Sequence, residues 1–225
     1  YVVDNANITP PKGFTVTYNA NGGTTEVGSE VSTKTFESWL LTGGGKFVGN
    51  TYTFGTKDED GTLTANYKNN SINLTTAKKV GYTFTGWYLD SNCTQALVLN
   101  ADGTYTPQKD ITIYAGWSAN QVTYKVYRYL ENANNENYTL YGDVIEGKAA
   151  AGSTLTLLTE ANKNQIANTK YVGANLTGGT LGVGTSITTT TVAPDGTTNI
   201  YLYYDRNEYT LTLEKNEYIE TVTGA

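Results

Sequence analysis

A block of about fifty residues occurs twice in the first half of the chain, and this duplication constrains the fold more than any other feature. Three short segments recur in the same order: 36–40 (FESWL) as 84–88 (FTGWY), 50–53 (NTYT) as 103–106 (GTYT), and 62–67 (TLTANY) as 112–117 (TIYAGW). Because the order is kept and the spacing drifts little, we interpret the two blocks as copies of one unit.

Each copy is composed of residues that favour strands. In 111–117 (ITIYAGW) apolar and polar positions alternate, which indicates a strand with one apolar face. Residues 14–18 (FTVTY) predict another strand, and 19–23 (NANGG) predict a turn because Asn and Gly tolerate positive φ. Apolar residues form no long 3.6-residue stripe, so we expect short helices only within 92–101 or 158–168.

The pattern resets near residue 118, and a longer unit of a second type follows. Further strands are expected at 122–130 (VTYKVYRYL), 139–144, 153–158 and 199–204 (NIYLYY), with an irregular stretch over 175–191. Residues 209–213 (YTLTL) then restart the pattern. The predicted organisation is an N-terminal extension (1–12), a duplicated repeat domain (13–118), a β domain (119–206) and the opening strand of a truncated repeat (207–225).

Composition removes several classes of chemistry. The chain has no His and one Cys, which excludes Ser-His-Asp and Cys-His nucleophiles, His-ligated zinc and Cys-rich zinc sites. We interpret Cys93 as a small structural residue in or near a turn. The net charge is −6 and the sequence pI is about 4.7, which argues against nucleic acid and anionic membrane surfaces as partners.

Carboxylates are the remaining candidates for catalysis or metal binding. The run Asp58-Glu59-Asp60 and the pair Asp90 and Asp102 could hold calcium, but their spacing does not match a twelve-residue calcium loop. A glycosidase pair needs a deep cleft, which repeats this small rarely enclose. We therefore expect no enzyme, no metal and no cofactor.

Three motifs in the first half resemble a known family. Segments 14–23 (FTVTYNANGG), 81–88 (GYTFTGWY) and 113–117 (IYAGW) are similar to the Listeria–Bacteroides repeat, the B-repeat of internalin-type surface proteins, over 13–118. The resemblance implies a small β-grasp-like fold, a bacterial cell-surface location and a role as spacer or weak adhesive module. The first copy lacks the Gly-Tyr lead-in and reads Ser38-Trp39-Leu40, so the copies form either one merged domain or two.

The second half looks like a MucBP-type, or mucin-binding, repeat over 122–206. The matching pieces are 122–130 (VTYKVYRYL), 150–154 (AAGST), 193–196 (APDG) and 201–207 (YLYYDRN). This resemblance implies a possible host glycoprotein or glycan as partner.

Aromatic residues are the candidate binding groups, and each has a structural alternative. The tryptophans Trp39, Trp87 and Trp117 could be sugar-stacking platforms, but small domains depend on every large side chain for their core. We favour a core role for the set Phe36, Trp39, Phe84, Trp87 and Trp117.

Tyrosines form the second candidate set. A solvent-facing stripe could contact a ligand, and its members are Tyr124, Tyr127, Tyr129, Tyr201 and Tyr203. The alternative is cross-strand Tyr–Thr pairing that stiffens a stalk, and we favour it.

The fold class predicted is mainly β (β-rich α+β), with tandem small β-grasp-like or β-sandwich-like repeat domains in an elongated chain. The chain has no Met, so we expect a piece of a longer protein.

The expected function is a non-catalytic stalk or spacer with an adhesive role, extracellular and attached to the bacterial cell wall through other segments. It would be a monomer within that longer chain. The alternative is a glycan- or mucin-binding adhesin module that uses exposed Tyr and Trp.

Overall fold

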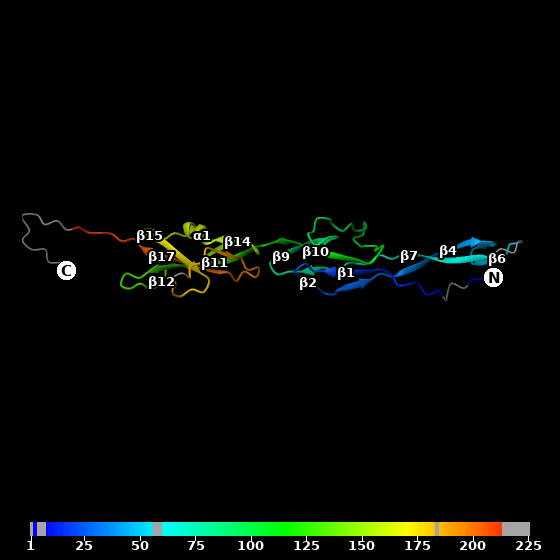
Figure 1. Cartoon of the computed structure of the whole chain (residues 1–225), viewed down its shortest axis with the longest axis horizontal. Helices are drawn as coiled ribbons and strands as arrows, with labels where there is room; N and C mark the ends of the chain where they lie inside the picture. Colours follow the sequence, from blue (N-terminus) through cyan, green and yellow to red (C-terminus); the bar gives the residue numbers. More distant parts are fainter. Residues whose placement is uncertain (1, 4–7, 56–59, 183–184, 213–225) are drawn as a thin grey trace, which may run out of the picture. The chain divides into compact units, whose positions relative to one another are not determined.

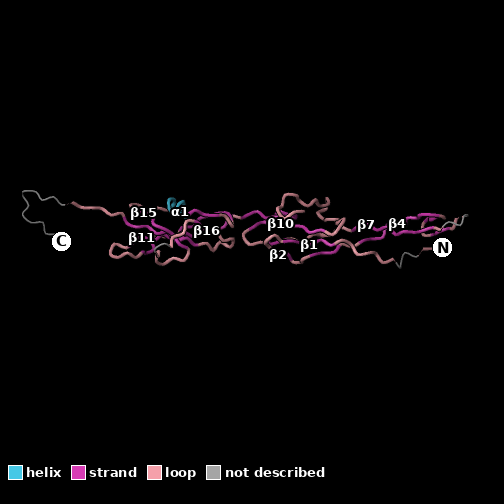
Figure 2. Tube along the Cα trace, viewed as in Figure 1, coloured by secondary structure: helices cyan, strands magenta, loops and turns pink. Residues whose placement is uncertain are grey.

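The computed structural model describes residues 2–3, 8–55, 60–182 and 185–212 (Figure 1). In that part of the chain strands dominate, and Figure 2 shows one short helix, α1, among them. The mainly-β class predicted from the sequence is therefore confirmed. The elements are, in order, β1 (Thr15–Asn19), β2 (Thr24–Thr25), β3 (Ser29–Val31), β4 (Lys34–Gly43), β5 (Lys46–Val48), β6 (Thr51–Thr53), β7 (Gly61–Asn69), β8 (Ala77–Lys78), β9 (Tyr82–Tyr88), β10 (Ile111–Ala119), β11 (Gln121–Glu131), β12 (Tyr138–Leu140), β13 (Ile145–Ala150), β14 (Thr154–Thr156), α1 (Leu157–Lys163), β15 (Thr169–Asn175), β16 (Thr189–Thr191) and β17 (Asn199–Arg206).

The chain divides into two compact units, Tyr1–Asn120 and Gln121–Ala225. Strand β10 ends at Ala119 and β11 begins at Gln121, so one residue lies between the last strand of unit 1 and the first strand of unit 2. Both fifty-residue copies fall within unit 1.

The main sheet of unit 1 has the strand order β3-β1-β10-β9. Its first and last strands, β1 and β10, are parallel neighbours at the centre, with Val16 opposite Ile111. The period-two pattern explains the burial, because Val16, Tyr18, Ile113 and Ala115 all point into one buried cluster. The predicted turn after β1 is formed by Asn21 and Gly22, both with positive φ.

The main sheet of unit 2 has the order β12-β11-β17-β15, with β13 also paired to β11. Again the first and last strands, β11 and β17, are parallel at the centre, with pairs from Lys125–Asn199 to Leu130–Tyr204. Helix α1 covers one face of this sheet, where Leu157 and Ala161 join a core cluster with strand residues such as Leu202. The main sheets of the two units therefore have the same arrangement: the first and last strands are parallel at the centre, and each has an antiparallel neighbour on its outer side.

Three antiparallel strand pairs also share one irregularity. In each pair the first strand carries one extra residue directly after an aromatic residue, which forms a β-bulge. The aromatic residue faces an aromatic partner on the second strand at each bulge, and the ring centroids lie 6.1 Å apart for Phe36–Tyr67, 5.7 Å for Phe84–Trp117 and 5.9 Å for Tyr171–Tyr204. Residues 119–206 therefore share this bulged pair with unit 1, and their interpretation as a second type of unit stays a prediction.

Some predicted elements are absent from the structure, and some strands of the structure were not predicted. Residues 92–101 form turns and extended chain instead of a helix, whereas α1 does lie in the other predicted range. Residues 207–212 form no strand, because a strand needs a neighbouring strand to satisfy its backbone groups, and Leu213 lies outside the described residues. Strands β13, β15 and β16 lie where no strand was predicted, and β12 covers only the start of the strand predicted over 139–144.

Candidate functional site

The face of the unit 2 sheet opposite α1 carries a row of tyrosines. Tyr127 and Tyr201 lie opposite each other on the parallel strands β11 and β17, with ring centroids 4.7 Å apart and nearly parallel planes. Tyr129 and Tyr203 form the next pair, with centroids 5.3 Å apart. The structure therefore brings together four of the five tyrosines proposed as ligand contacts, and we call these four the tyrosine row.

One end of the tyrosine row is closed by other parts of the unit. The Tyr203 hydroxyl donates to the Gly179 carbonyl at 2.9 Å and accepts from Asn175 Nδ2 at 3.1 Å, while the Tyr138 ring packs edge-on at 5.2 Å. Tyr203 is 0% exposed as a result. It cannot contact a ligand at the surface, and the half-buried Tyr127, Tyr129 and Tyr201 remain.

An acidic group lies beside the closed end of the row. The Tyr138 hydroxyl donates to Asp205 Oδ1. Burial, together with this bond to a carboxylate, raises the pKa of Tyr138. Burial and the neighbouring Tyr127 and Tyr129 also raise the pKa of Tyr201. The Tyr138 and Tyr201 hydroxyls are thus protonated at neutral pH.

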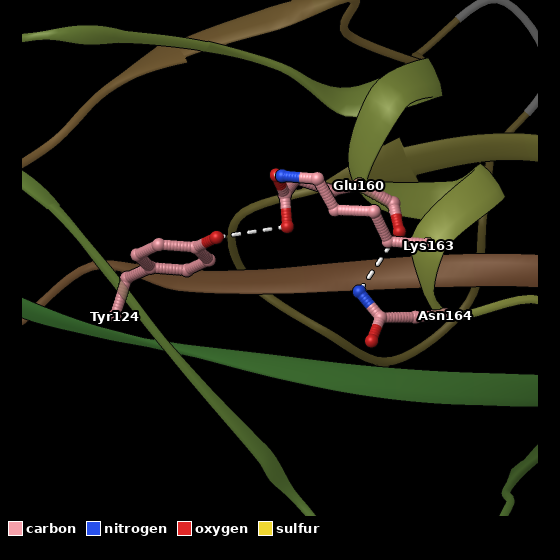
Figure 3. A network of polar contacts seen from close by, with 4 residues as sticks. All are labelled: Tyr124, Glu160, Lys163 and Asn164. Carbon is pink, nitrogen blue, oxygen red and sulfur yellow. Dashed lines mark hydrogen bonds and ion pairs between the residues drawn. The ribbon is translucent and has the colours of Figure 1, made fainter.

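Tyr124, the fifth predicted ligand contact, lies on the opposite face of the sheet. It is buried, because even-numbered residues of β11 near it point toward α1. Its hydroxyl donates to Glu160 Oε2 at 2.8 Å, and Lys163 Nζ contacts the other carboxylate oxygen at 2.7 Å (Figure 3). The prediction that Tyr124 contacts a ligand is therefore wrong, since its ring belongs to the core.

The network around Glu160 was not predicted from the sequence. Glu160 is only 3% exposed, and its carbonyl also accepts from Asn164 Nδ2 at 2.8 Å at the end of α1 (Figure 3). Burial and the carboxylate raise the pKa of Tyr124 to about 12. A buried charge is tolerated when it is paired and hydrogen-bonded, which is the case here. This arrangement fixes α1 to the sheet and exposes no reactive group.

The tryptophans of the second copy lie in or against the core of unit 1. Trp87 is 7% exposed and its Nε1 donates to the Thr75 carbonyl at 2.8 Å. Trp117 packs against the same cluster and donates to the Ala20 carbonyl at 3.1 Å, and Phe84 lies between the two rings. Their N–H groups are satisfied by backbone carbonyls, and the rings lie in or against the buried cluster of unit 1.

Phe36 and Trp39 occupy the equivalent places in the first copy but do not join that core. They lie on β4, which pairs with β7 in a two-stranded ribbon within the described residues, and both are half-buried. Their ring centroids are 5.4 Å apart. A two-stranded ribbon has no full second layer, so it cannot bury large rings completely. They are not members of the buried cluster of unit 1, and their core role stays a prediction.

The acidic residues considered for metal binding or catalysis organise turns. Asp90 accepts backbone N–H bonds from Asn92, Thr94 and Gln95, and these bonds lower its pKa. Asp102 likewise accepts from Thr104, with a lowered pKa. Among the described residues no cluster of three or more His, Cys, Asp or Glu could hold a metal, and Asp58 and Glu59 lie outside them.

Described residues of unit 1 line two surface cavities, among others. One of 570 Å³ is polar, and Asp102 in its lining is bonded to its own turn. The other, of 340 Å³, is lined mainly by apolar and aromatic groups next to Phe84 and Trp87. Cys93 lies in a turn with φ of 56°, with its Sγ 3.5 Å from the Ala115 carbonyl oxygen.

No helix in the described part of the chain is long and apolar enough to cross a membrane. Comparison with curated proteins finds no match, and neither does comparison with solved structures. Residues 50–116 match the family model of the Listeria-Bacteroides repeat domain, from just before β6 into β10. This matched segment is similar to the repeat regions of bacterial surface proteins, a class of domain that is generally non-catalytic.

Proposed function

We propose that this chain is a non-catalytic, force-bearing spacer of a bacterial cell-surface protein, extracellular and attached to the cell wall through other segments. The family match of residues 50–116 supports the surface location. The parallel pairing of the first and last strands in both units is the observation that carries the spacer role.

Parallel pairing decides where the chain enters and leaves each unit. Because β11 and β17 run in the same direction, the start of β11 and the end of β17 lie at opposite ends of the sheet. A force applied to the two ends of the unit then slides one strand along the other. All hydrogen bonds of the ladder resist this movement together, which slows forced unfolding. β1 and β10 give unit 1 the same arrangement.

The shared sheet order supports a β-grasp-like description of both units, which we include in the proposal. Each places a parallel pair between antiparallel neighbours, and unit 2 adds α1 against one face. A MucBP-like relationship of residues 122–206 belongs to the same proposal.

Single-molecule stretching of the whole chain tests the spacer role. We expect two unfolding steps. The contour lengths are roughly 380 Å for residues 14–119 and roughly 310 Å for residues 121–206, at about 3.6 Å per residue, and each step should release this length less the folded end-to-end distance. The unit 2 step should need the higher force, since its parallel ladder has six residue pairs and that of unit 1 has four. A featureless extension curve would contradict the proposal.

A second candidate function is weak adhesion to a host glycan or glycoprotein through the tyrosine row. The stacked, half-buried pair Tyr127 and Tyr201 is the observation that favours it. We expect binding to a glycan array by the native chain and loss of it in Tyr127→Ala, with Tyr141→Ala as a matched control at an exposed tyrosine. Equal binding by both variants, or none by the native chain, would refute this role.

A further inference from the structure

The stacked pair Tyr127 and Tyr201 lies within the ladder that joins the first and last strands of unit 2. Six residue pairs form this parallel ladder, and Tyr127–Tyr201 is the third. The ring centroids are 4.7 Å apart and the ring planes differ by 14°. Because opposed residues of a parallel pair lean in the same direction along their strands, the hydroxyl-bearing ends of the two rings lie side by side.

The neighbouring contacts of the tyrosine row lack this geometry. The Tyr129 ring is tilted by 58° from that of Tyr201, at 6.1 Å, and by 34° from that of Tyr203, at 5.3 Å. Tyr203 is also fully buried, with its hydroxyl hydrogen-bonded. Within the row, the Tyr127–Tyr201 contact therefore combines the shortest centroid distance with the most nearly parallel rings.

Both rings of this pair are accessible from solvent. Tyr127 and Tyr201 are half-buried, and neither hydroxyl has a hydrogen-bond partner in the part of the chain that the structure describes. In that same part, Arg128 Nε is the one buried side-chain nitrogen or oxygen without a partner. The two phenol hydroxyls are thus open to water, which can accept a proton from each of them.

We propose that Tyr127 and Tyr201 are an oxidative cross-linking site, at which a haem peroxidase with hydrogen peroxide joins the two rings as dityrosine. Each phenol gives up one electron and its hydroxyl proton and becomes a phenoxyl radical. The radicals join through a carbon–carbon bond between one Cε atom of each ring, and the hydrogens of these two carbons move to the oxygens, which restores both phenols. In total two electrons and two protons pass to one hydrogen peroxide, which leaves as two water molecules.

The cross-link would fix the first strand of unit 2 to the last strand. Force that slides β11 along β17 would then pass through the new carbon–carbon bond, and the chain between residues 127 and 201 would no longer extend. This removes roughly 270 Å from the extension of unit 2, at about 3.6 Å per residue. The mechanical consequence rests on the proposed spacer role, whereas the cross-link itself rests on the ring geometry.

Peptide mapping of the whole chain after treatment with hydrogen peroxide and a haem peroxidase tests the site. Trypsin cuts after Lys and Arg, so Tyr127 is the one tyrosine in the peptide 126–128, and Tyr201 lies in the peptide 171–206. The oxidised monomer should contain these two peptides joined, with a mass lower than their sum by two hydrogen atoms. Fragmentation should place the bond at Tyr201. The proposal is overturned if the oxidised monomer lacks this joined peptide.

Two conservative variants test the role of the stacked pair. Tyr201→Phe keeps a ring against Tyr127 but has no hydroxyl to oxidise, so the joined peptide should disappear. Tyr129→Phe is the matched control, since Tyr129 is also a half-buried member of the row, and it should give the joined peptide in native yield. The native chain oxidised in denaturant should spread its cross-links over several tyrosines. An equal yield of dityrosine in the two variants, or an unchanged pattern in denaturant, would overturn the proposal.

Single-molecule stretching separates the cross-link from the spacer role. After oxidation the native chain should keep the unit 1 step and lose the unit 2 step, whereas Tyr201→Phe treated in the same way should keep both. A complete unit 2 step in molecules that carry the joined peptide would overturn the locking of the two strands. A featureless curve of the chain before oxidation would overturn the spacer role, and the joined peptide would still decide whether the site exists.

Discussion

At the scale of single residues, glycine and tyrosine pack together where no sequence pattern marks the contact. Gly147 on β13 lies opposite Tyr124 on β11. A Cβ at position 147 would overlap Cζ of that ring. The ring cannot move away freely, since its hydroxyl is bonded to the buried Glu160. From the sequence, Tyr124 was a candidate surface residue. Tyrosines occur on both faces of this strand, and the period-two pattern does not say which face packs against the rest of the unit.

Gly147→Ala should therefore destabilise unit 2 by about 1–3 kcal/mol, the range for overpacking a fixed site. Chemical denaturation monitored by tyrosine and near-ultraviolet signals measures the change. Lys148→Ala, at the exposed neighbouring position, is the control and should change stability by no more than about 0.5 kcal/mol. Equal effects of the two substitutions would mean that the Tyr124 contact is not rigid.

At the scale of elements, strands with clear alternation were predictable and strands without it were not. β1, β10 and the core of β11 follow period-two patterns, and these are present as expected. β13 (IEGKAA) and β15 (TKYVGAN) have short, glycine-interrupted patterns, so only pairing with β11 and β17 makes them strands. The duplication predicted that the two blocks are copies of one unit, but not that a third bulged pair would lie at Tyr171 and Tyr204.

The turn after β9 should respond to acid through Asp90. Backbone N–H bonds lower the pKa of this carboxyl in the folded state, so its contribution to stability is present above the unfolded value of about 3.9 and is lost as pH falls below it. We expect Asp90→Ala to lower the thermal midpoint of unit 1 at neutral pH and to weaken its dependence on pH in acid. Glu26→Ala, an exposed acidic position in the same unit, is the control. An unchanged acid dependence in Asp90→Ala would contradict this role of the turn.

At the scale of the whole molecule, buried tyrosines in both units have a raised pKa. Burial raises the pKa of Tyr124 and of Tyr204 to about 12, and it also raises the pKa of Tyr18 and Tyr138. Each folded value lies above the unfolded value of about 10, so the folded state binds more protons in alkaline solution. The composition showed the 19 tyrosines, but their burial could not be predicted without the sheet packing.

The contribution of these tyrosines to the free energy of unfolding should therefore be fully present up to about pH 10, and it should be lost as pH rises toward about 12. Thermal unfolding across this range, with parallel measurement of tyrosinate absorbance, should show falling midpoints before the buried tyrosines ionise. Tyr124→Phe should have a weaker alkaline dependence than the native chain. A thermal midpoint that is the same at about pH 9 and about pH 11.5 would contradict the burial of these hydroxyls.

The direction of pulling tests the central claim, that parallel pairing of the first and last strands lets each unit bear force. Handles at residues 121 and 206 load the β11–β17 ladder in shear, whereas handles at 121 and 197 lie at the same end of both strands and open the ladder one pair at a time. With Cys93 replaced by Ser and cysteines placed at these positions, unit 2 should unfold in the second geometry at roughly half the force or less. Equal unfolding forces in the two geometries would contradict the account.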